Sequence, residues 1–199
     1  MPKLYERVRW GILGPGIIAH KFVAGLSVIP DAEVVAVGSR SKDRANAFAD
    51  EYGIRHRYGS YQELASDPDV DVIYVATPHT FHKEHTLLCL NAGKPVLCEK
   101  PMAVNAQEVA EMIQVAREKN LFLMEAMWTR FLPVWVKVRE LLADGVIGEP
   151  RMLAADFGFR APIDPEHRLF NPSLAGGALL DVGVYTVSLA FMVFGRAPD

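Results

Sequence analysis

The sequence predicts an α/β protein in which a doubly wound parallel sheet is followed by the beginning of a second α/β domain. Three observations predict this fold class. Short apolar runs alternate with amphipathic segments, a glycine-rich motif joins the first run to the first such segment, and the alternation stops near Met127. We therefore expect one domain over residues 1–126 and an incomplete second domain over residues 127–199.

The composition describes a globular chain with a sizeable core. Of its 199 residues, 50% are hydrophobic and the formal net charge is −3, which excludes a disordered chain and gives no general attraction to nucleic acid or to an anionic membrane. Residues 1–7 carry charges where a signal peptide needs an apolar core, and we expect no apolar run long enough to span a bilayer. Cys89 and Cys98 are expected to be reduced thiols, so we predict a cytoplasmic protein.

The alternation in the first domain assigns its elements in order. The apolar, β-branched runs predict strands at residues 8–13, 34–37, 70–76, 95–98 and 121–125. The segments between them have apolar residues at helical spacing and predict helices at residues 17–29, 42–52, 80–92 and 105–119. Such βαβ units form a parallel sheet with helices on both faces. Because ligands of these sheets bind beyond the carboxyl ends of the strands, the functional site is expected there.

The pattern after Met127 predicts a different kind of unit. Residues 133–143 are expected to form a helix, residues 151–159 alternate as a strand does, and residues 176–194 are expected to form a second helix. A single strand and two helices make a poor independent core. We therefore expect the second domain to be truncated.

The glycine-rich motif is Gly14-x-Gly16-x-x-Ala19, between the first expected strand and the first expected helix. In that context the pattern is typical of a Rossmann fold that binds a dinucleotide. Gly14 would form the tight turn, Gly16 would let the backbone approach the pyrophosphate, and Ala19 would let helix and strand pack closely. The N–H groups of Ile17 and Ile18 would face the phosphates at the helix N-terminus. The alternative is an ordinary strand-to-helix turn, and the βαβ context favours the nucleotide.

The end of the second expected strand favours NADP over NAD. An NAD site usually has an Asp or Glu about 20 residues beyond the glycines, where it binds the ribose hydroxyls. Here the strand ends at Ser39 and Arg40, with Ser41 and Arg44 close by and no carboxylate at the tip. A guanidinium and hydroxyl groups suit a 2′-phosphate. The alternative is a solvated helix start with Arg40 directed at water.

Polar residues also follow two later strands of the expected sheet. Thr77-Pro78-His79 follows one strand, and Glu99-Lys100-Pro101 follows the next. A lysine beside a nicotinamide can hydrogen-bond a substrate hydroxyl and stabilise the developing alkoxide. The alternative is an ordinary surface lysine.

The spacing of His79, His82 and His85 is suggestive of metal ligands. On a helix, His79 and His82 share a face while His85 turns away, and no cysteine accompanies them. We therefore expect no metal site, and we expect His82 to contact the cofactor pocket.

The sequence resembles the Gfo/Idh/MocA family of oxidoreductases in four segments, "GILGPGIIA", "YVATPHTFH", "CEKPMAVN" and "GGALLDVGVY". The resemblance runs through nearly the whole chain. It implies a Rossmann domain followed by a larger domain with an open, mostly antiparallel sheet, which in the family usually forms the interface of a homo-oligomer. Within the family, the likeness is closest to members that use NADP and oxidise trans-dihydrodiols and certain pentoses. Such relatives are longer, so most of that sheet would lie beyond residue 199, and the oligomeric state of this chain is left open.

The resemblance assigns catalytic roles to three residues. The family's lysine falls on Lys100, which the family joins to Pro101 by a cis bond. The family's acidic residue and its acid/base partner fall on Asp181 and Tyr185, and the i, i+4 spacing puts both on one helix face. A phenol ordinarily ionises near pH 10, so as a base it needs help from a group such as a nearby lysine. Without the resemblance, the residues alone favour a capping carboxylate and a core tyrosine.

The cofactor-binding residues implied by motif and resemblance together form a larger set. They are Gly14, Gly16, Ile17, Ile18, Ser39, Arg40, Arg44, Thr77, Pro78, His79, His82, Glu99, Lys100, Trp128 and Arg130. Trp128 and Arg130 match residues that line the active site in similar proteins. His79 departs from the family pattern, in which many relatives have Asn.

The resemblance implies a small-molecule substrate with a secondary alcohol, in a sugar, a polyol or a trans-dihydrodiol. Tyr185 would take the hydroxyl proton, Lys100 would polarise the oxygen, and Asp181 would orient the neighbouring hydroxyls. The hydride would pass to NADP⁺. The alternative hypothesis is a truncated chain that binds NADP(H) without turnover.

Overall fold

The computed structural model describes residues 7–196 of the chain. Its backbone packing divides the chain into two compact units, Met1–Ala126 and Met127–Asp199. The two units differ in the kind of secondary structure that they contain.

The first unit is built on one parallel sheet. Six strands lie in the order β3-β2-β1-β4-β5-β6, and each neighbouring pair is parallel. The strands are β1 (Val8–Leu13), β2 (Ala32–Gly38), β3 (His56–Tyr58), β4 (Val72–Val75), β5 (Val96–Cys98) and β6 (Leu123–Glu125). The order reverses between β1 and β4, and ligands of doubly wound sheets bind at such a switch point.

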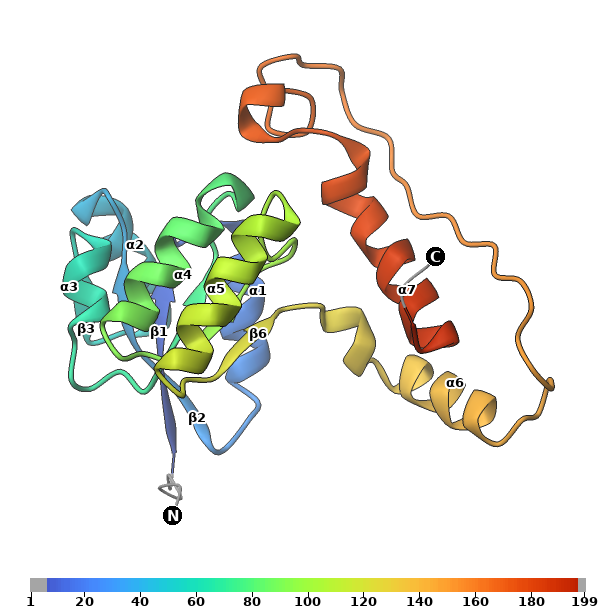
Figure 1. The fold of residues 1–199 in the computed structure, drawn as a ribbon. Helices are drawn as coiled ribbons and strands as arrows, with labels where there is room; N and C mark the ends of the chain where they lie inside the picture. Colours follow the sequence, from blue (N-terminus) through green and yellow to red (C-terminus); the bar gives the residue numbers. More distant parts are fainter. Residues whose placement is uncertain (1–6, 197–199) are drawn as a thin grey trace. The chain divides into compact units, whose positions relative to one another are not determined.

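Helices cover both faces of this sheet. They are α1 (Ile17–Leu26), α2 (Lys42–Tyr52), α3 (Tyr61–Ala65), α4 (His82–Asn91) and α5 (Ala106–Glu118), and a 3₁₀ turn, η1 (His79–Phe81), leads into α4. Figure 1 shows α4 and α5 in front of the strands. The side chains of α1 and α2 belong to the core on the opposite face.

Successive strand residues fill two separate cores because their side chains point to opposite faces of the sheet. Leu13 and Ile73 pack with residues of α3, α4 and α5, while Ile12 and Tyr74 pack with residues of α1 and α2. All four side chains are at most 1% exposed. Burial on both faces explains why these strands are continuous apolar runs rather than alternating ones.

The structure confirms the predicted fold class and most elements of the first unit. Strand β1 and helix α2 begin and end at the predicted residues. The prediction missed β3, which has three residues and no apolar run, and α3, which is only five residues long. A capping box between Ser60 and Glu63 begins α3, and this pattern could have revealed the helix from the sequence.

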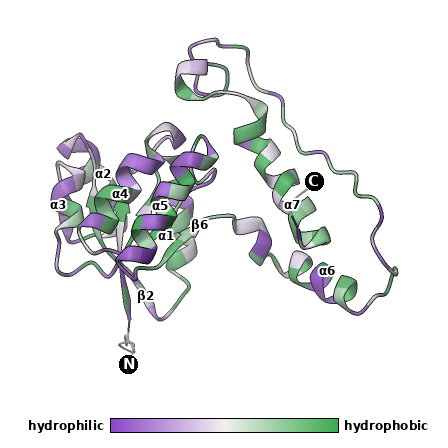
Figure 2. Ribbon diagram, viewed as in Figure 1, coloured by the Kyte–Doolittle hydropathy of each residue, from purple (hydrophilic) through white to green (hydrophobic). Residues whose placement is uncertain are grey.

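The second unit contains only helical elements among its described residues. They are η2 (Trp128–Phe131), α6 (Pro133–Ala143), η3 (Pro172–Leu174), a π-helical turn η4 (Leu179–Gly183) and α7 (Val184–Phe194). Helix α6 lies where it was predicted, whereas the predicted helix at 176–194 begins with the π-helical turn. Figure 2 shows that α7 is almost entirely hydrophobic, yet none of its described side chains is fully buried.

The strand predicted at residues 151–159 is wrong. This segment is irregular in the structure. A strand needs a neighbour that pairs with its N–H and C=O groups, and the described part of the second unit contains no other strand. The apolar alternation is present in the sequence, but Phe157 and Phe159 are both more than half exposed.

The expectation that no apolar run could span a bilayer is also wrong by length and composition. The helical run Pro172–Phe194 has 23 residues and is apolar enough to cross a membrane. Asp181, in the π-helical turn, is the only charged residue of this run. Length and composition alone are weak evidence for a membrane span, because core helices of soluble proteins pass the same test.

Candidate active site

The glycine turn after β1 has the geometry of a phosphate-binding loop. Gly14 has φ +95°, and a Cβ at this position would lie 2.9 Å from Cγ2 of Thr77, so only glycine fits. At Gly16 an added Cβ would lie 3.8 Å from the nearest atom, the carbonyl oxygen of Ala76, which is an ordinary contact. The protein itself therefore has room for a side chain at Gly16, and glycine there leaves that room to a ligand.

The N-terminus of α1 is arranged to accept an anion. No side chain caps the helix, and no acidic residue lies in its first turn. Ile17, the first residue of α1, is 84% exposed. Uncapped N–H groups and the positive end of the helix dipole attract phosphate.

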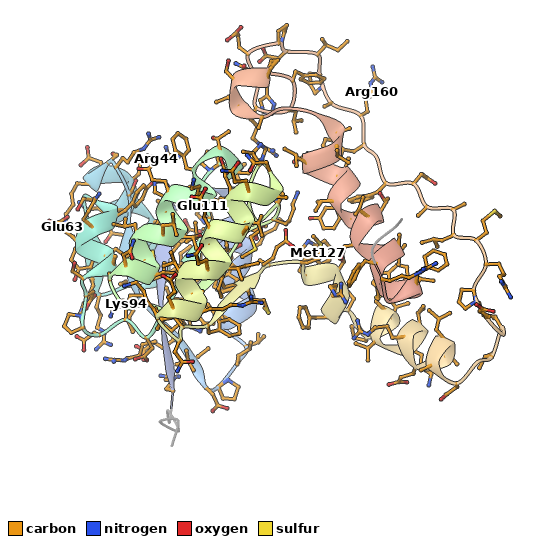
Figure 3. The ribbon with its side chains drawn as sticks, viewed as in Figure 1. Arg44, Glu63, Lys94, Glu111, Met127 and Arg160 are labelled. Carbon is orange, nitrogen blue, oxygen red and sulfur yellow. The ribbon has the colours of Figure 1, made fainter. Side chains whose placement is uncertain are left out.

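Ser39 and Arg40 stand at the carboxyl end of β2, as predicted. Ser39 is buried, while Arg40 is exposed with its guanidinium carbon 5.8 Å from the centre of the Phe81 ring. Ser41 caps α2 and accepts a hydrogen bond from the backbone N–H of Arg44 at 3.4 Å. Figure 3 places Arg44 at this end of the sheet and Lys94 at the opposite end. Two guanidinium groups thus lie near the same strand end.

The end of β4 is held by buried histidines. The Oγ1 of Thr77 lies 2.9 Å from Nδ1 of His85. His82 is 1% exposed, with Nε2 2.8 Å from the Thr77 carbonyl oxygen and Nδ1 2.7 Å from the Pro101 carbonyl oxygen. Burial lowers the pKa of His82, although both carbonyl contacts act in the opposite direction. His79 is also buried, and it lies on η1 rather than on the helix that carries His82 and His85.

The role of His82 as a cofactor contact stays a prediction. Both of its ring nitrogens already face backbone carbonyls of the protein. Because a neutral imidazole has one N–H, it can donate to only one of them at a time. The spacing of the histidines in the sequence could not show these contacts, since the Pro101 carbonyl belongs to the loop that follows β5.

The end of β5 presents Glu99 and Lys100. The bond between Lys100 and Pro101 is cis, as the resemblance implies. Glu99 accepts hydrogen bonds from the hydroxyl of Tyr74 and, at 3.0 Å, from the backbone N–H of Lys100. Burial raises the pKa of Glu99, while these two hydrogen bonds and the charge of Lys100 lower it. Lys100 is thus carried by a loop that begins at Glu99, whose carboxylate is held by the Tyr74 hydroxyl and the Lys100 N–H.

The predicted acid/base residue lies in the wall of a cavity of about 240 Å³ in the second unit. Tyr185 lines it together with Trp128, Arg130 and Phe157. The indole N–H of Trp128 donates to the Tyr185 hydroxyl oxygen at 3.0 Å, and the ring of Phe157 meets the Tyr185 ring edge-on at 5.2 Å. The carbonyl oxygen of Arg130 accepts a hydrogen bond from Arg139 at 2.6 Å. The structure thus gathers three predicted residues around one apolar hollow.

Asp181 lies in the π-helical turn that precedes Tyr185. The residue is 9% exposed, and its carboxylate accepts a hydrogen bond from Arg168 at 2.9 Å. The segment that carries Arg168 packs tightly, because a Cβ on Gly176 would lie 2.9 Å from the Arg168 carbonyl oxygen. Sequence reasoning missed Arg168, whose partner is 13 residues away, beyond η3. π-Helical turns are frequent at functional sites.

One further group of side chains has the spacing of a metal site among the described residues. His56, Asp67 and Asp69 lie within reach of a shared ion. However, Nδ1 of His56 already lies 2.6 Å from Asp67, and the Tyr58 hydroxyl donates to the same carboxylate oxygen at 3.0 Å. The cluster therefore acts as an internal hydrogen-bond network, and it lies apart from the glycine turn and the ends of β4 and β5.

Two family models match this chain. One, described as an oxidoreductase family with an NAD-binding Rossmann fold, matches residues 8–127, and the other, the GFO/IDH/MocA C-terminal domain, matches residues 135–199. The chain belongs to the Gfo/Idh/MocA oxidoreductase family, and the resemblance found in the sequence is confirmed.

Individual relatives agree with this assignment. The trans-1,2-dihydrobenzene-1,2-diol dehydrogenase of Mus musculus is 50% identical over 190 residues, which are 94% of this chain and 56% of that protein. The chain thus spans little more than half the length of the curated relatives that it matches.

Solved structures of the family superpose well on this chain. KijD10, a 3-ketoreductase from Actinomadura kijaniata solved with NADP and TDP-benzene, is 36% identical with a TM-score of 0.84, over 94% of this chain and 57% of that one. An aldose-aldose oxidoreductase from Caulobacter crescentus, solved with glycerol, is 29% identical with a TM-score of 0.89, over 96% and 59%. The family model and the NADP-bound neighbour support a nicotinamide cofactor.

Proposed function

We propose that this chain binds NADP and forms the cofactor-binding part of an oxidoreductase that acts on a secondary alcohol. The observation that carries the proposal is the uncapped glycine turn at α1, followed by exposed Arg40 rather than a carboxylate at the end of β2. The turn suits a pyrophosphate, and the guanidinium suits a 2′-phosphate.

The residues present fit a dinucleotide. Gly14 and Gly16 shape the turn, and the N–H groups of Ile17 and Ile18 open the uncapped helix toward the phosphates. Ser39, Arg40 and Arg44 would hold the adenosine ribose and its 2′-phosphate. Thr77, Pro78, His79 and Glu99 would line the nicotinamide half.

The protein's own groups would then handle the substrate. NADP⁺, when bound, supplies the hydride acceptor. Lys100 would donate a hydrogen bond to the substrate oxygen and stabilise its negative charge, and Tyr185 would take the hydroxyl proton as the carbonyl forms. Asp181, held by Arg168, would accept hydrogen bonds from neighbouring hydroxyls of the substrate. The reaction would convert a secondary alcohol to a ketone, or the reverse.

The names of the relatives support the substrate class. They act on a dihydrodiol, on aldoses or as a 3-ketoreductase, and all of these substrates carry oxygen on a secondary carbon. A sugar, polyol or trans-dihydrodiol is therefore the substrate that we propose. A second candidate function is binding of NADP(H) without turnover, which is favoured because the glycine turn and Arg40 both lie in the first unit.

Cofactor choice is tested by titrating the purified chain with NADPH and NADH and following the fluorescence of the bound nicotinamide. We expect Arg40→Ala to raise the Kd for NADPH about tenfold or more, since a charge-assisted hydrogen bond is lost, while the Kd for NADH changes little. Arg55→Ala, an exposed arginine paired with Glu33, is the matched control. An equal effect of Arg40→Ala on both cofactors would overturn the NADP assignment.

Turnover is tested with D-xylose and a cyclic trans-diol as substrates and NADP⁺ as acceptor. Tyr185→Phe should lower kcat by about a hundredfold or more and leave the Kd for NADPH unchanged, because a general base is lost and the cofactor site is kept. Wild-type chain that binds NADPH without reducing NADP⁺ selects the second candidate function. Full turnover by Tyr185→Phe would exclude Tyr185 as the base.

A further inference from the structure

The loop that carries Lys100 is held at three successive residues by side chains. The N–H of Lys100 donates to Glu99 at 3.0 Å, the carbonyl of Pro101 lies 2.7 Å from His82, and the N–H of Met102 donates to Glu125 at 2.8 Å. Glu99 directly follows β5, His82 belongs to α4, and Glu125 is the last residue of β6. One backbone polar group at each of these three residues therefore has a side-chain partner.

Glu125 occupies the position in β6 that allows this contact. Cys98 is the last residue of β5, and its register partner in β6 is Glu125. The ladder continues with the N–H of Ala126, which donates to the Cys98 carbonyl at 2.7 Å. Beyond that point the loop turns away from the ladder, and the carboxylate of Glu125 reaches across to Met102.

We propose that Glu125 is a positioning residue for Lys100. It holds the backbone of Met102, and Met102 in turn fixes the loop that carries Lys100. The role rests on the proposed function, in which Lys100 polarises the substrate oxygen. A lysine side chain is long and flexible, so its ammonium group is placed only as well as the backbone that carries it. A carboxylate that accepts from a backbone N–H forms a charge-assisted bond, which holds a loop more firmly than a neutral one.

The electrostatic setting agrees with this role. Glu99 is buried beside Lys100, and the negative charge of Glu125 adds to the burial that raises the pKa of Glu99. The two carboxylates are thus close enough to affect one another across the loop, although like charges oppose this arrangement. Each of them is offset by a backbone N–H of the loop, at Lys100 and at Met102. The loop and the carboxylates hold one another in place.

The test follows Lys100 directly and requires no turnover. Lysines of the purified chain are reductively methylated with ¹³C-formaldehyde, and the Lys100 signal is assigned by its loss in Lys100→Arg. We expect Glu125→Ala to shift or broaden the Lys100 signal alone, and amide exchange at Met102 to accelerate about tenfold as its hydrogen bond is lost. Glu125→Gln, which keeps an acceptor oxygen, should restore most of the wild-type signal.

Glu118→Ala is the matched control, because Glu118 accepts a bond from Gln114 on the exposed surface of α5. If Glu125→Ala does not fold, Glu125→Asp is used instead. Its side chain is shorter by one methylene, so its carboxylate no longer reaches the Met102 N–H, and the Lys100 signal is compared with wild type in the same way. An unchanged Lys100 signal in a folded variant whose Met102 amide exchanges faster would overturn the proposal. Failure of wild-type chain to bind NADPH would instead count against the proposed function, and it would leave the Lys100 signals interpretable.

Discussion

The two units of this chain bury their apolar side chains to very different degrees. In the first unit, Ile12 and Leu13 on adjacent positions of β1 are both fully buried, one on each face of the sheet. In the second unit, α6 and α7 have no fully buried side chain among the described residues, and Leu179 is 69% exposed. A covered sheet buries two faces at once, whereas helices without a sheet leave one face of each uncovered.

This difference separates two groups of predicted site residues, one in each unit. The glycine turn and the ends of β2, β4 and β5 stand on a closed core, so their geometry follows from the fold. Tyr185 and Trp128 are held chiefly by their own hydrogen bond and by the ring of Phe157, which comes from an irregular segment. The residues of the first unit are therefore expected to be held more rigidly than Tyr185 and Trp128, and the predictions below test the packing of each unit.

The largest effect is expected in the core of the first unit. Ile73 on β4 is fully buried, and Ile73→Ala leaves a cavity that should lower the free energy of unfolding by about 3 kcal/mol. Urea unfolding followed by circular dichroism measures this change. A loss below about 1 kcal/mol would show that the first unit is loosely packed and that the two units do not differ as described.

A smaller effect is expected at the ion pair between Arg9 and Asp71. Burial alone would raise the pKa of the Asp71 carboxyl, but hydrogen bonds from the side chain and the backbone N–H of Arg9 lower it below its ordinary value. A carboxyl whose pKa is lower in the folded state stabilises the fold above the unfolded-state pKa near 3.9, and this contribution is lost as the pH falls through the folded-state value.

Asp71→Asn should therefore lower the free energy of unfolding by about 2 kcal/mol at pH 7 and by much less at pH 2. Thermal melts from pH 2 to pH 7 measure the difference. Asp156→Asn, on an exposed segment of the second unit, is the control and should leave the pH dependence unchanged. A constant difference between Asp71→Asn and wild type across this range would contradict the lowered pKa.

The sequence predicted the first unit well because its signals are local. A buried strand, a glycine turn and a helix start each lie within a few neighbouring residues, and the parallel order follows from their alternation. Gly14, Arg40 and Lys100 were found this way, each at the end of a strand. The predicted strand at residues 151–159 failed because strand formation depends on a neighbouring strand, which alternation cannot supply.

The residues that sequence reasoning missed have partners far along the chain. Arg168 meets Asp181, which lies beyond η3, and Glu125 meets Met102 from a neighbouring strand. The sequence predicted a role for His82, but not its contact with Pro101, which depends on how α4 packs against the loop after β5. Contacts of this kind follow no regular spacing in the sequence, so only the structure could reveal them.

A still smaller effect is expected at the start of α3. The Ser60 side chain accepts from the N–H of Glu63, and the Glu63 side chain accepts from the N–H of Ser60. Ser60→Ala removes one half of this capping box and should lower the free energy of unfolding by about 1 kcal/mol. Ser60→Asp, which restores an acceptor, should recover most of the loss in the same urea titration. An unaffected midpoint in Ser60→Ala would mean that α3 is fixed by its buried face alone.

The smallest change in stability is expected on the apolar face of α7. Phe191 is 46% exposed, so Phe191→Ser should alter the free energy of unfolding by less than about 0.5 kcal/mol. It removes part of an exposed apolar patch, and for that reason it should reduce self-association measured by sedimentation velocity. A loss of several kcal/mol would instead show that this face is covered in solution, and the second unit would then be built on a closed core as the first is.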